Sequence, residues 1–380
     1  MFRFVRPRVA ASLVLAALVL PLPGVLAAGP AEPSIVGGTT VRPGEYPFVV
    51  SLQRAAGTGA AAHFCGGSLV DPQWVLTAAH CMQGLTPSDF RLVLGATRLS
   101  AGTGEVRQPA EIRVDPAWDG DATHGADIAL VRLSQPVIDV APIEPVRTGE
   151  RSRWEAGGAA TVVGWGVTSE AGTVASDDLR AVRLTIRPDT EMSAATAYGA
   201  KFLATDMIGA GGDATGGKDA CYGDSGGPLV VSAGRAGPRQ VGIVSFGAGC
   251  GRAGYPGVYS RLGEGRVRAF ADSLVALRAV PVRAAEGATA RFTLTLGRPS
   301  TLPVSVGWAT GGQTATAGAD FTAGRGVARI PPGETAATVD VPLTADNLAE
   351  HDETFRLRLS APVNTWLAAE SVVATIVDGG

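Results

Sequence analysis

The hydrophobic positions divide the chain into two regions with different patterns. From about residue 35 to residue 261, short apolar runs are separated by glycine and proline, as in FVVSL, RLVLG, IALVRL, TVVGWG and VGIVSF. Short strands at this spacing are typical of antiparallel sandwiches and barrels. Farther along, RFTLTL, TVDVPL and FRLRL alternate apolar and polar residues, which predicts strands with one buried face. The sequence therefore predicts an all-β protein with two domains, residues 35–278 and 279–380.

A single helix is expected between the two regions. The segment VRAFADSLVALR has apolar residues at Val267, Phe270, Leu274 and Leu277, which is a helical spacing. We expect this helix to close the first domain. A chain of 380 residues is long for one ordinary domain and suits two.

The first 34 residues predict export and processing. Three arginines within the first eight residues precede the apolar run VAASLVLAALVL, which is shorter than the ~20 residues that span a bilayer. Small residues then fit cleavage after Ala27. We expect a signal peptide at residues 1–27, a short propeptide at 28–34 and no membrane span after signal removal. The expected location is extracellular, with the periplasm as the alternative.

The composition argues against two classes of protein. The chain is 46% hydrophobic, which is too apolar for a disordered chain. Its formal net charge is −3 with both signs spread along the sequence, so nucleic acid is not the expected partner.

The four cysteines suggest disulfide bonds in an exported chain. Four cysteines allow three pairings, and pairing neighbours in the sequence would give Cys65–Cys81 and Cys221–Cys250. A zinc site is the alternative, but no CxxC or HxxxH spacing supports it.

Three separate segments could supply the groups that peptide-bond attack requires. Such attack needs an activated nucleophile, a base that takes its proton, and a group that holds the base. LTAAHC contains His80, GADIALVRL contains Asp127, and GDSGGP contains Ser225. Each residue alone is more often structural. Together, the order His, Asp, Ser is the one found in chymotrypsin-type enzymes.

Longer segments around these residues resemble the trypsins, serine endopeptidases of the chymotrypsin fold. The resemblance covers residues 35–277 and runs through IVGGTTVRPGEYPFVVSL, FCGGSLVDPQWVLTAAHC, DIALVRL, GWG, GGKDACYGDSGGPLV and GIVSFGAGC…YPGVY. It implies two antiparallel six-stranded barrels with the active site between them. It also implies protein or peptide substrates and no cofactor for catalysis.

The resemblance assigns roles to the three candidate catalytic residues. Ser225 would be the nucleophile, His80 the general base and then acid, and Asp127 the group that orients the imidazole. The backbone N–H groups of Gly223 and Ser225 would form the oxyanion hole, where glycine leaves room for the substrate carbonyl.

A second set of residues would determine specificity. Asp219 stands where trypsins keep a carboxylate at the base of the primary pocket, and Gly247 and Gly257 match the glycines that leave this pocket open. Because a buried carboxylate needs a partner, cleavage after Arg or Lys follows.

The resemblance also implies synthesis as a zymogen. Asp224 would pair with the free amine of Ile35 after cleavage before that residue, and the pair would shape the oxyanion hole. Ser34 precedes Ile35 where a self-activating trypsin would have Arg or Lys, so we expect a different activating protease.

The sequence departs from the trypsins at several positions. Phe246 replaces the usual Trp of the pocket wall. Gly209 stands where a cysteine is expected, and SAATAYGA lacks the partner cysteine. Ala96 replaces an acidic ligand of the animal calcium loop, although Glu105 follows, so we expect no calcium there.

The C-terminal region resembles a Calx-β domain, a β-sandwich. The segments TATAGADF, PPGET and HDETF carry this resemblance. Some members of this family bind Ca²⁺ with acidic loop residues, and a hard cation prefers several oxygen ligands. The matching acids form a candidate weak Ca²⁺ site, and they are Glu286, Asp320, Asp346, Glu350 and Asp378. The alternative is that these acids only cap strands, because Ala345 and Gly379 replace two usual acidic positions.

The main interpretation is a secreted endopeptidase with a Calx-β-like accessory domain. Two alternatives from other classes are a non-catalytic binding protein that kept the protease fold, and an adhesion protein in which the tail dominates. Loss of a catalytic residue or of Gly223 would favour the first alternative, and neither is lost.

Overall fold

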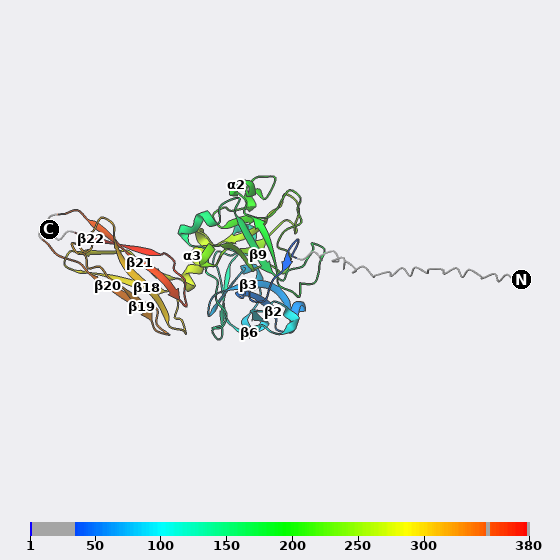
Figure 1. Ribbon diagram of the computed structural model, residues 1–380, viewed down its shortest axis with the longest axis horizontal. Helices are drawn as coiled ribbons and strands as arrows, with labels where there is room; N and C mark the ends of the chain where they lie inside the picture. The colour runs from blue at the N-terminus through cyan, green and yellow to red at the C-terminus, as the bar shows by residue number, and fades with distance from the viewer. Residues whose placement is uncertain (2–34, 347–349, 378–380) are drawn as a thin grey trace. The chain divides into compact units, whose positions relative to one another are not determined.

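The described chain is built mainly from β-sheet, as Figure 1 shows for the computed structural model. The structure describes Met1 and residues 35–346 and 350–377. The expected signal cleavage site, the propeptide and Asp378 therefore lie outside the described residues. Within the described part, the strands form two seven-stranded sheets and then sheets of three and five strands.

The first seven-stranded sheet comes from the N-terminal half of the first region. Its strands are β2 (Val49–Arg54), β3 (His63–Asp71), β4 (Trp74–Thr77), β5 (Phe90–Leu94), β6 (Glu105–Arg107), β7 (Pro109–Val114) and β8 (Ala129–Leu133). They are ordered β6-β5-β2-β3-β4-β8-β7, and every pair is antiparallel.

The second seven-stranded sheet follows the same antiparallel plan. Its strands are β1 (Thr39–Thr40), β9 (Ala159–Gly164), β10 (Arg180–Thr185), β11 (Met207–Ala210), β12 (Pro228–Ser232), β13 (Pro238–Phe246) and β14 (Gly257–Arg261). Their order is β1-β10-β9-β12-β13-β14-β11. The resemblance implied six strands in each barrel, and the short edge strands β6 and β1 bring each sheet to seven.

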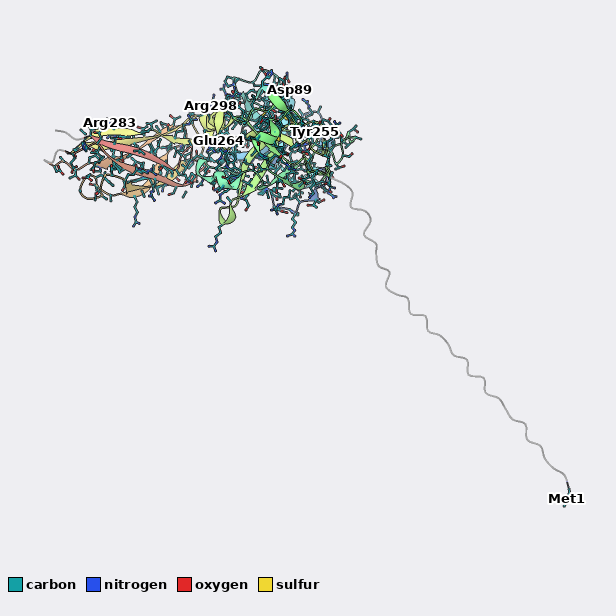
Figure 2. All side chains as sticks on the ribbon, turned by 90° about the horizontal axis from the view of Figure 1, so that it is seen from above. Met1, Asp89, Tyr255, Glu264, Arg283 and Arg298 are labelled. Atoms are coloured by element: carbon teal, nitrogen blue, oxygen red, sulfur yellow. A yellow bond between two sulfur atoms is a disulfide. The ribbon has the colours of Figure 1, made fainter. Side chains whose placement is uncertain are left out.

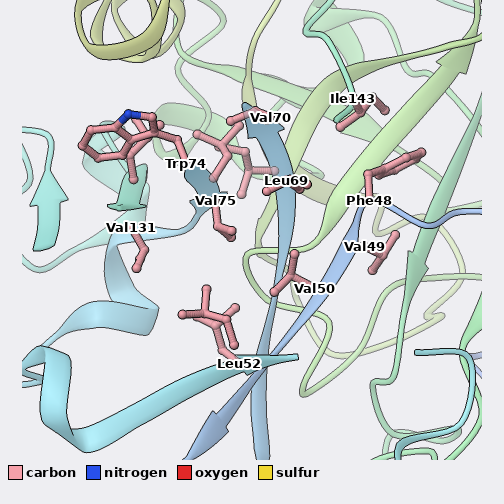
Figure 3. Close-up of a cluster of buried hydrophobic side chains, with 14 of the residues drawn as sticks. Phe48, Val49, Val50, Leu52, Leu69, Val70, Trp74, Val75, Val131 and Ile143 are labelled. Atoms are coloured by element: carbon pink, nitrogen blue, oxygen red, sulfur yellow. The ribbon is translucent and has the colours of Figure 1, made fainter. Parts of the chain in front are cut away.

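Apolar side chains from neighbouring strands hold the first sheet in its register. Figure 3 shows buried side chains of β2, β3, β4 and β8, with Phe48 and Ile143 beside them, which belong to one hydrophobic cluster. Burying each Val or Leu side chain is worth about 1.5–3 kcal/mol. The labelled residues are Phe48, Val49, Val50, Leu52, Leu69, Val70, Trp74, Val75, Val131 and Ile143. This core fixes β4 against β8, and the two strands position the first functional side chains.

The described chain has three α-helices, α1 (Ala79–Met82), α2 (Asp189–Met192) and α3 (Gly265–Val275). We expected the last helix to include Leu277, but α3 ends at Val275 and Leu277 begins a strand. The side chain of Leu277 is buried in the C-terminal core, so its apolar character serves the sandwich and not the helix. None of the described helices has the length and apolar character that a membrane crossing requires.

The C-terminal region forms the expected β-sandwich. One sheet contains β15 (Leu277–Ala279), β17 (Thr289–Leu296) and β20 (Ala336–Pro342). The other contains β16 (Val282–Ala285), β18 (Val304–Gly312), β19 (Arg325–Ile330), β21 (Glu353–Val363) and β22 (Ser371–Val377). Its order is β16-β22-β21-β18-β19, with only β16 and β22 parallel. Between the sheets, Phe355 stacks on Phe321 with ring centroids 4.4 Å apart.

Specific contacts join the sandwich to the first region. The indole of Trp366 is 2% exposed and belongs to the same core as Trp74 and Val275. Its Nε1–H donates to Asp272 Oδ1 on α3 at 2.7 Å, and Asp272 also pairs with Arg268. The last turns of the first region therefore pack against a side chain that the second region supplies.

Candidate active site

The pairing of β4 with β8 brings the candidate histidine and aspartate together. Thr77 lies opposite Ala129 in this pair, and His80 follows β4 while Asp127 precedes β8. Asp127 Oδ2 lies 2.8 Å from His80 Nδ1, and Asp127 Oδ1 accepts the His80 backbone N–H at 2.9 Å. Because a carboxylate only accepts, Nδ1 carries the proton and Nε2 remains available as a base.

Two serine hydroxyls also hold Asp127 in place. Its carboxylate also accepts the hydroxyl of Ser245 at 2.6 Å, and its carbonyl accepts the hydroxyl of Ser260 at 2.7 Å. The preceding Ala126 has a φ of 57°, a left-handed conformation that costs a non-glycine residue about 1 kcal/mol or more. Sequence reasoning missed Ser245, although a polar residue inside the apolar run VGIVSF was an available signal.

Ser225 lies in a turn that packs closely on β3 and β4. Its carbonyl accepts the N–H of Gly66 at 2.7 Å. A Cβ atom at Gly66 would approach Gly227 to 2.9 Å, and one at Gly226 would approach Thr77 Oγ1 to 2.2 Å. Glycines therefore permit the contact that holds Ser225 near the end of β4, where His80 follows.

The polar groups at Ser225 are open to an incoming molecule. Among the described residues, no acceptor pairs with the backbone N–H of Gly223 or of Ser225. Gly223 has a φ of 94°, and a Cβ atom there would come within 3.2 Å of Gly166. No hydrogen bond between described residues joins Ser225 Oγ to His80, and such bonds often form only when substrate binds.

A second histidine, His63, is buried and supports Gly223. His63 Nε2 lies 2.9 Å from the carbonyl oxygen of Gly223, so Nε2 carries the proton. His63 Nδ1 then accepts the hydroxyl of Ser51 at 2.8 Å. Burial lowers the pKa of His63 to about 4, so it is neutral at pH 7. Sequence reasoning missed this residue, because its partner is far away in the chain.

A cavity of about 240 Å³ opens beside Ser225 and ends at Asp219. Its walls include Phe246, Gly247 and Gly257. Asp219 is 3% exposed; its Oδ2 accepts the N–H of Gly251 at 3.0 Å, whereas its Oδ1 has no hydrogen-bond partner among the described residues. Burial raises the pKa of Asp219 to about 7. The cavity therefore ends at a buried carboxylate that has no cationic partner in the part of the chain that the structure describes.

The glycines and one tyrosine keep this cavity open. A Cβ atom at Gly257 would lie 2.8 Å from Asp219 Oδ1 and would cover it. Tyr198 packs edge-on against Phe246, donates its hydroxyl to Pro256 O at 2.7 Å and accepts the N–H of Ala248. Tyr198 supports the wall from outside the cavity, and the sequence carried no signal for this role.

Asp224 is buried behind the nucleophile loop. Its carboxylate accepts the N–H groups of Gly166 at 2.8 Å and Cys221 at 2.9 Å. A Cβ atom at Gly166 would lie 2.2 Å from Asp224 Oδ2, so only glycine fits there. Burial raises the pKa of Asp224 to about 7. Ile35 is also fully buried, in the core of the second sheet.

Comparison with known proteins agrees with this geometry. The family model for trypsin matches residues 35–265. The chain belongs to the trypsin family. Trypsin from Saccharopolyspora erythraea is 38% identical over 229 residues, which is 60% of this chain and 93% of that protein. Trypsin epsilon from Drosophila erecta is 38% identical over 227 residues, 60% of this chain and 82% of that protein. The Calx-beta domain model matches residues 279–380.

Both expected disulfides are present in the trypsin-family domain. Cys65 bonds to Cys81, and Cys221 bonds to Cys250. His80 lies beside the first pair, but sulfurs in a disulfide are not thiolates that could bind a metal. The site of the missing third disulfide is filled in another way, because a Cβ atom at Gly209 would lie 2.2 Å from the sulfur of Met192.

The Calx-beta domain brings together only part of the expected acidic set. The carboxylates of Asp320, Glu350 and Glu353 lie within 4.8 Å of one another. Burial and then the charges of Asp320, Glu350 and Glu286 raise the pKa of Glu353. Asp346 does not belong to this three-carboxylate group. Sequence reasoning missed Glu353, although HDETF contains it.

Proposed function

We propose that this chain is an exported serine endopeptidase that cleaves peptide bonds after Arg and Lys. The observation that carries the proposal is the unpartnered Oδ1 of Asp219, at the base of the cavity that Ser225 also lines. A substrate guanidinium or ammonium entering the cavity would supply the missing partner and hold the next carbonyl beside Ser225.

The proposed reaction uses the groups already described. His80 Nε2 takes the proton from Ser225 Oγ as the oxygen attacks the substrate carbonyl carbon. The open N–H groups of Gly223 and Ser225 stabilise the negative oxygen, and one such donor is typically worth about 10²–10³ in turnover. His80 then protonates the leaving amine. Water, activated in the same way, releases the acyl group from Ser225.

Asp127 and His63 act as positioning residues in this proposal. Asp127 holds the imidazole in the tautomer that leaves Nε2 free, and it stabilises the imidazolium that forms. His63 holds the carbonyl of Gly223 and so limits rotation of that residue next to the oxyanion site.

We further propose that cleavage before Ile35 activates the enzyme. The carboxylate of Asp224 has two N–H donors but no cationic partner among the described residues, which supports a role for a newly freed amine. Breaking a buried ion pair costs about 3–5 kcal/mol, so a chain extended past Ile35 should have a poorly formed oxyanion hole. Because Ser34 precedes the bond, the activating protease accepts Ser there.

The decisive experiment compares matched Arg, Lys and Phe amide substrates with protein that begins at Ile35. We expect strong cleavage after Arg and Lys, and none from Ser225→Ala. Cleavage after Phe would keep the catalytic residues and overturn the pocket assignment. A folded, disulfide-bonded protein without activity would instead favour the non-catalytic binding protein. Protein beginning at Ala28 should be at least 100-fold less active, and equal activity would contradict the zymogen.

We also propose that the Calx-beta domain binds Ca²⁺ weakly. The convergence of Asp320, Glu350 and Glu353 supports this, because carboxylate oxygens fit the ion and dissociation constants of about 10⁻⁴–10⁻³ M are typical of extracellular modules. Calorimetry of the full chain with added Ca²⁺ tests it. The heat should disappear in Asp320→Asn with Glu353→Gln and persist in Asp340→Asn. Absence of heat in the unmodified chain would leave these acids with a structural role.

A further inference from the structure

The outer face of the five-stranded sheet carries four arginines in a defined arrangement. Leu357 and Leu359 point into the sandwich core, so Arg356 and Arg358 of β21 point outward. By the same alternation, Arg325 and Arg329 of β19 point outward, on either side of the half-exposed Val327. All four arginines are exposed.

The strand register places these arginines on both sides of β18. Arg325 on β19 and Arg358 on β21 both lie opposite Ala309. Arg329 lies opposite Ser305, and Arg356 lies opposite Gly311. Strands are about 4.8 Å apart, so the two arginine rows stand about 10 Å apart across the sheet.

The strand between the two rows has only small outward side chains. We call the four arginines and this floor the arginine trough, and the floor residues are Ser305, Gly307, Ala309 and Gly311. A Cβ atom at Gly311 would lie 3.3 Å from Arg358 Nε, so this side chain extends over the floor. The trough therefore has arginines along both sides, and the guanidinium group of Arg358 reaches over Gly311 of the floor.

The charges of the trough are not neutralised within the described chain. No described carboxylate lies in salt-bridge range of any of the four arginines. The nearby acids have other partners, since Asp352 pairs with Arg283 and Glu370 pairs with Arg147. Figure 2 shows Arg283 at the opposite end of the sandwich from Arg298, which pairs with Glu111. Arg283, Arg291 and Arg298 thus pair with carboxylates, whereas the trough arginines have no such partner among the described residues.

We propose that the arginine trough binds a linear anionic polysaccharide that carries carboxylate or sulfate groups. The planar guanidinium matches such groups through two parallel hydrogen bonds. Arginines two and four residues apart along a strand are about 7 Å and 13 Å apart, which suits charges repeated along an extended chain. The binding would hold the peptidase on an acidic polymer.

Other macromolecules fit the trough less well. A peptide strand could not add to β18, because that strand is already paired with β19 and β21. The face has no aromatic ring on which bases could stack, because the tryptophan of β18, Trp308, packs on the core side. A membrane surface would favour large apolar side chains for insertion, and the exposed ones on the described face are two valines, Val327 and Val363.

The test measures binding of the Ser225→Ala chain to heparin, to polygalacturonate and to neutral dextran, with phosphatidylglycerol vesicles and duplex DNA as comparison ligands. We expect binding to the two anionic polymers but not to dextran, with affinity falling about 10²-fold between 50 and 200 mM salt for four contacts. Replacing all four trough arginines by Gln should weaken binding at least 10-fold and flatten the salt dependence. If the fourfold variant does not fold, the double variant Arg356→Gln with Arg358→Gln replaces it, and we expect a smaller loss of binding.

A matched control separates the trough from general electrostatics. Changing Arg98, Arg151, Arg283 and Arg291 to Gln removes the same charge from arginines that are already paired, and binding should fall less than 3-fold. Equal losses in both fourfold variants would overturn the proposal, as would failure to bind either anionic polymer. Trough-dependent binding only to vesicles of phosphatidylglycerol, or only to duplex DNA, would reassign the surface and also overturn it.

Discussion

The two domains treat polar side chains in opposite ways. Every polar or charged side chain that is buried in the described chain lies between Ser51 and Asp272, within the trypsin-family domain. In the described part of the Calx-beta domain, the buried side chains are all apolar. Burying a polar group costs free energy unless the group is paired. The first domain therefore carries a cost that the described part of the second domain does not.

This difference indicates where each domain can carry function. Buried carboxylates such as Asp127, Asp219 and Asp224 are held in fixed positions, as chemistry on a substrate requires. The described part of the Calx-beta domain has an apolar core, and its charged groups lie on loop ends and on the exposed faces of its sheets. Any function of that domain therefore lies on its surface.

Of the changes that test this comparison, Asp219→Asn should have the largest effect. Loss of the charge at the base of the cavity should lower kcat/KM for Arg and Lys substrates on the order of 10³-fold, or about 4 kcal/mol. The value for a Phe substrate should change by less than about 10-fold. Asp213→Asn is the matched control, because its side chain is partly exposed and paired with Arg187. Uniform loss across all substrates would indicate damage to the fold and not to specificity.

The next effect concerns the contact between the domains. Trp366→Ala should lower the free energy of unfolding by about 3–5 kcal/mol, because it removes a buried indole from a core made mainly by the other domain. Trp366→Phe should cost less, losing chiefly the hydrogen bond to Asp272. Denaturant titration in the Ser225→Ala background measures both. The half-buried Trp308→Ala is the control, and a cost equal to that of Trp366→Ala would contradict the assigned role.

Local signals in the sequence predicted the parts of the site that depend on short segments. His80, Asp127, Ser225 and Asp219 each lie in a recognisable run, and strand pairing then brings them together. His63 could not be predicted, because its role depends on a hydrogen bond to Gly223, far away in the chain. Leu277 fits the helical spacing, yet the sandwich core takes its side chain. The spacing of apolar residues does not show which of two neighbouring hydrophobic cores will bury a given side chain.

A smaller effect should appear in the pH dependence of stability. The pKa of His63 is about 4 in the folded protein and about 6.5 when unfolded, so the unfolded chain binds more protons between these values. Its contribution is therefore present above pH 6.5 and is lost as pH falls, by up to about 3 kcal/mol near pH 4. His63→Gln keeps an N–H donor near Gly223 but cannot titrate. The stability advantage of the unmodified protein over this variant should shrink as pH falls.

Three buried acids change the free energy of unfolding with pH in the opposite direction to His63. Their effect cancels when the unmodified protein is compared with His63→Gln. Burial raises the pKa values of Asp71, Asp219 and Asp224 to about 7, so their contribution to stability falls as pH rises from about 4 to 7. Both proteins contain them, and the difference between unfolding free energies at pH 7, 6, 5 and 4 isolates His63. Parallel curves for the two proteins would mean that this histidine does not titrate as described.

The smallest effect should come from the trough of the Calx-beta domain. Arg356→Gln with Arg358→Gln should change the melting temperature by less than about 2 °C, because exposed side chains without partners contribute little to stability. A slight rise is expected, since like charges on one sheet face repel. Arg291→Gln, which breaks the pair with Asp340, should instead lower it slightly. A marked fall in the double variant would show that the trough arginines support the fold, which would weaken the case that they serve a ligand.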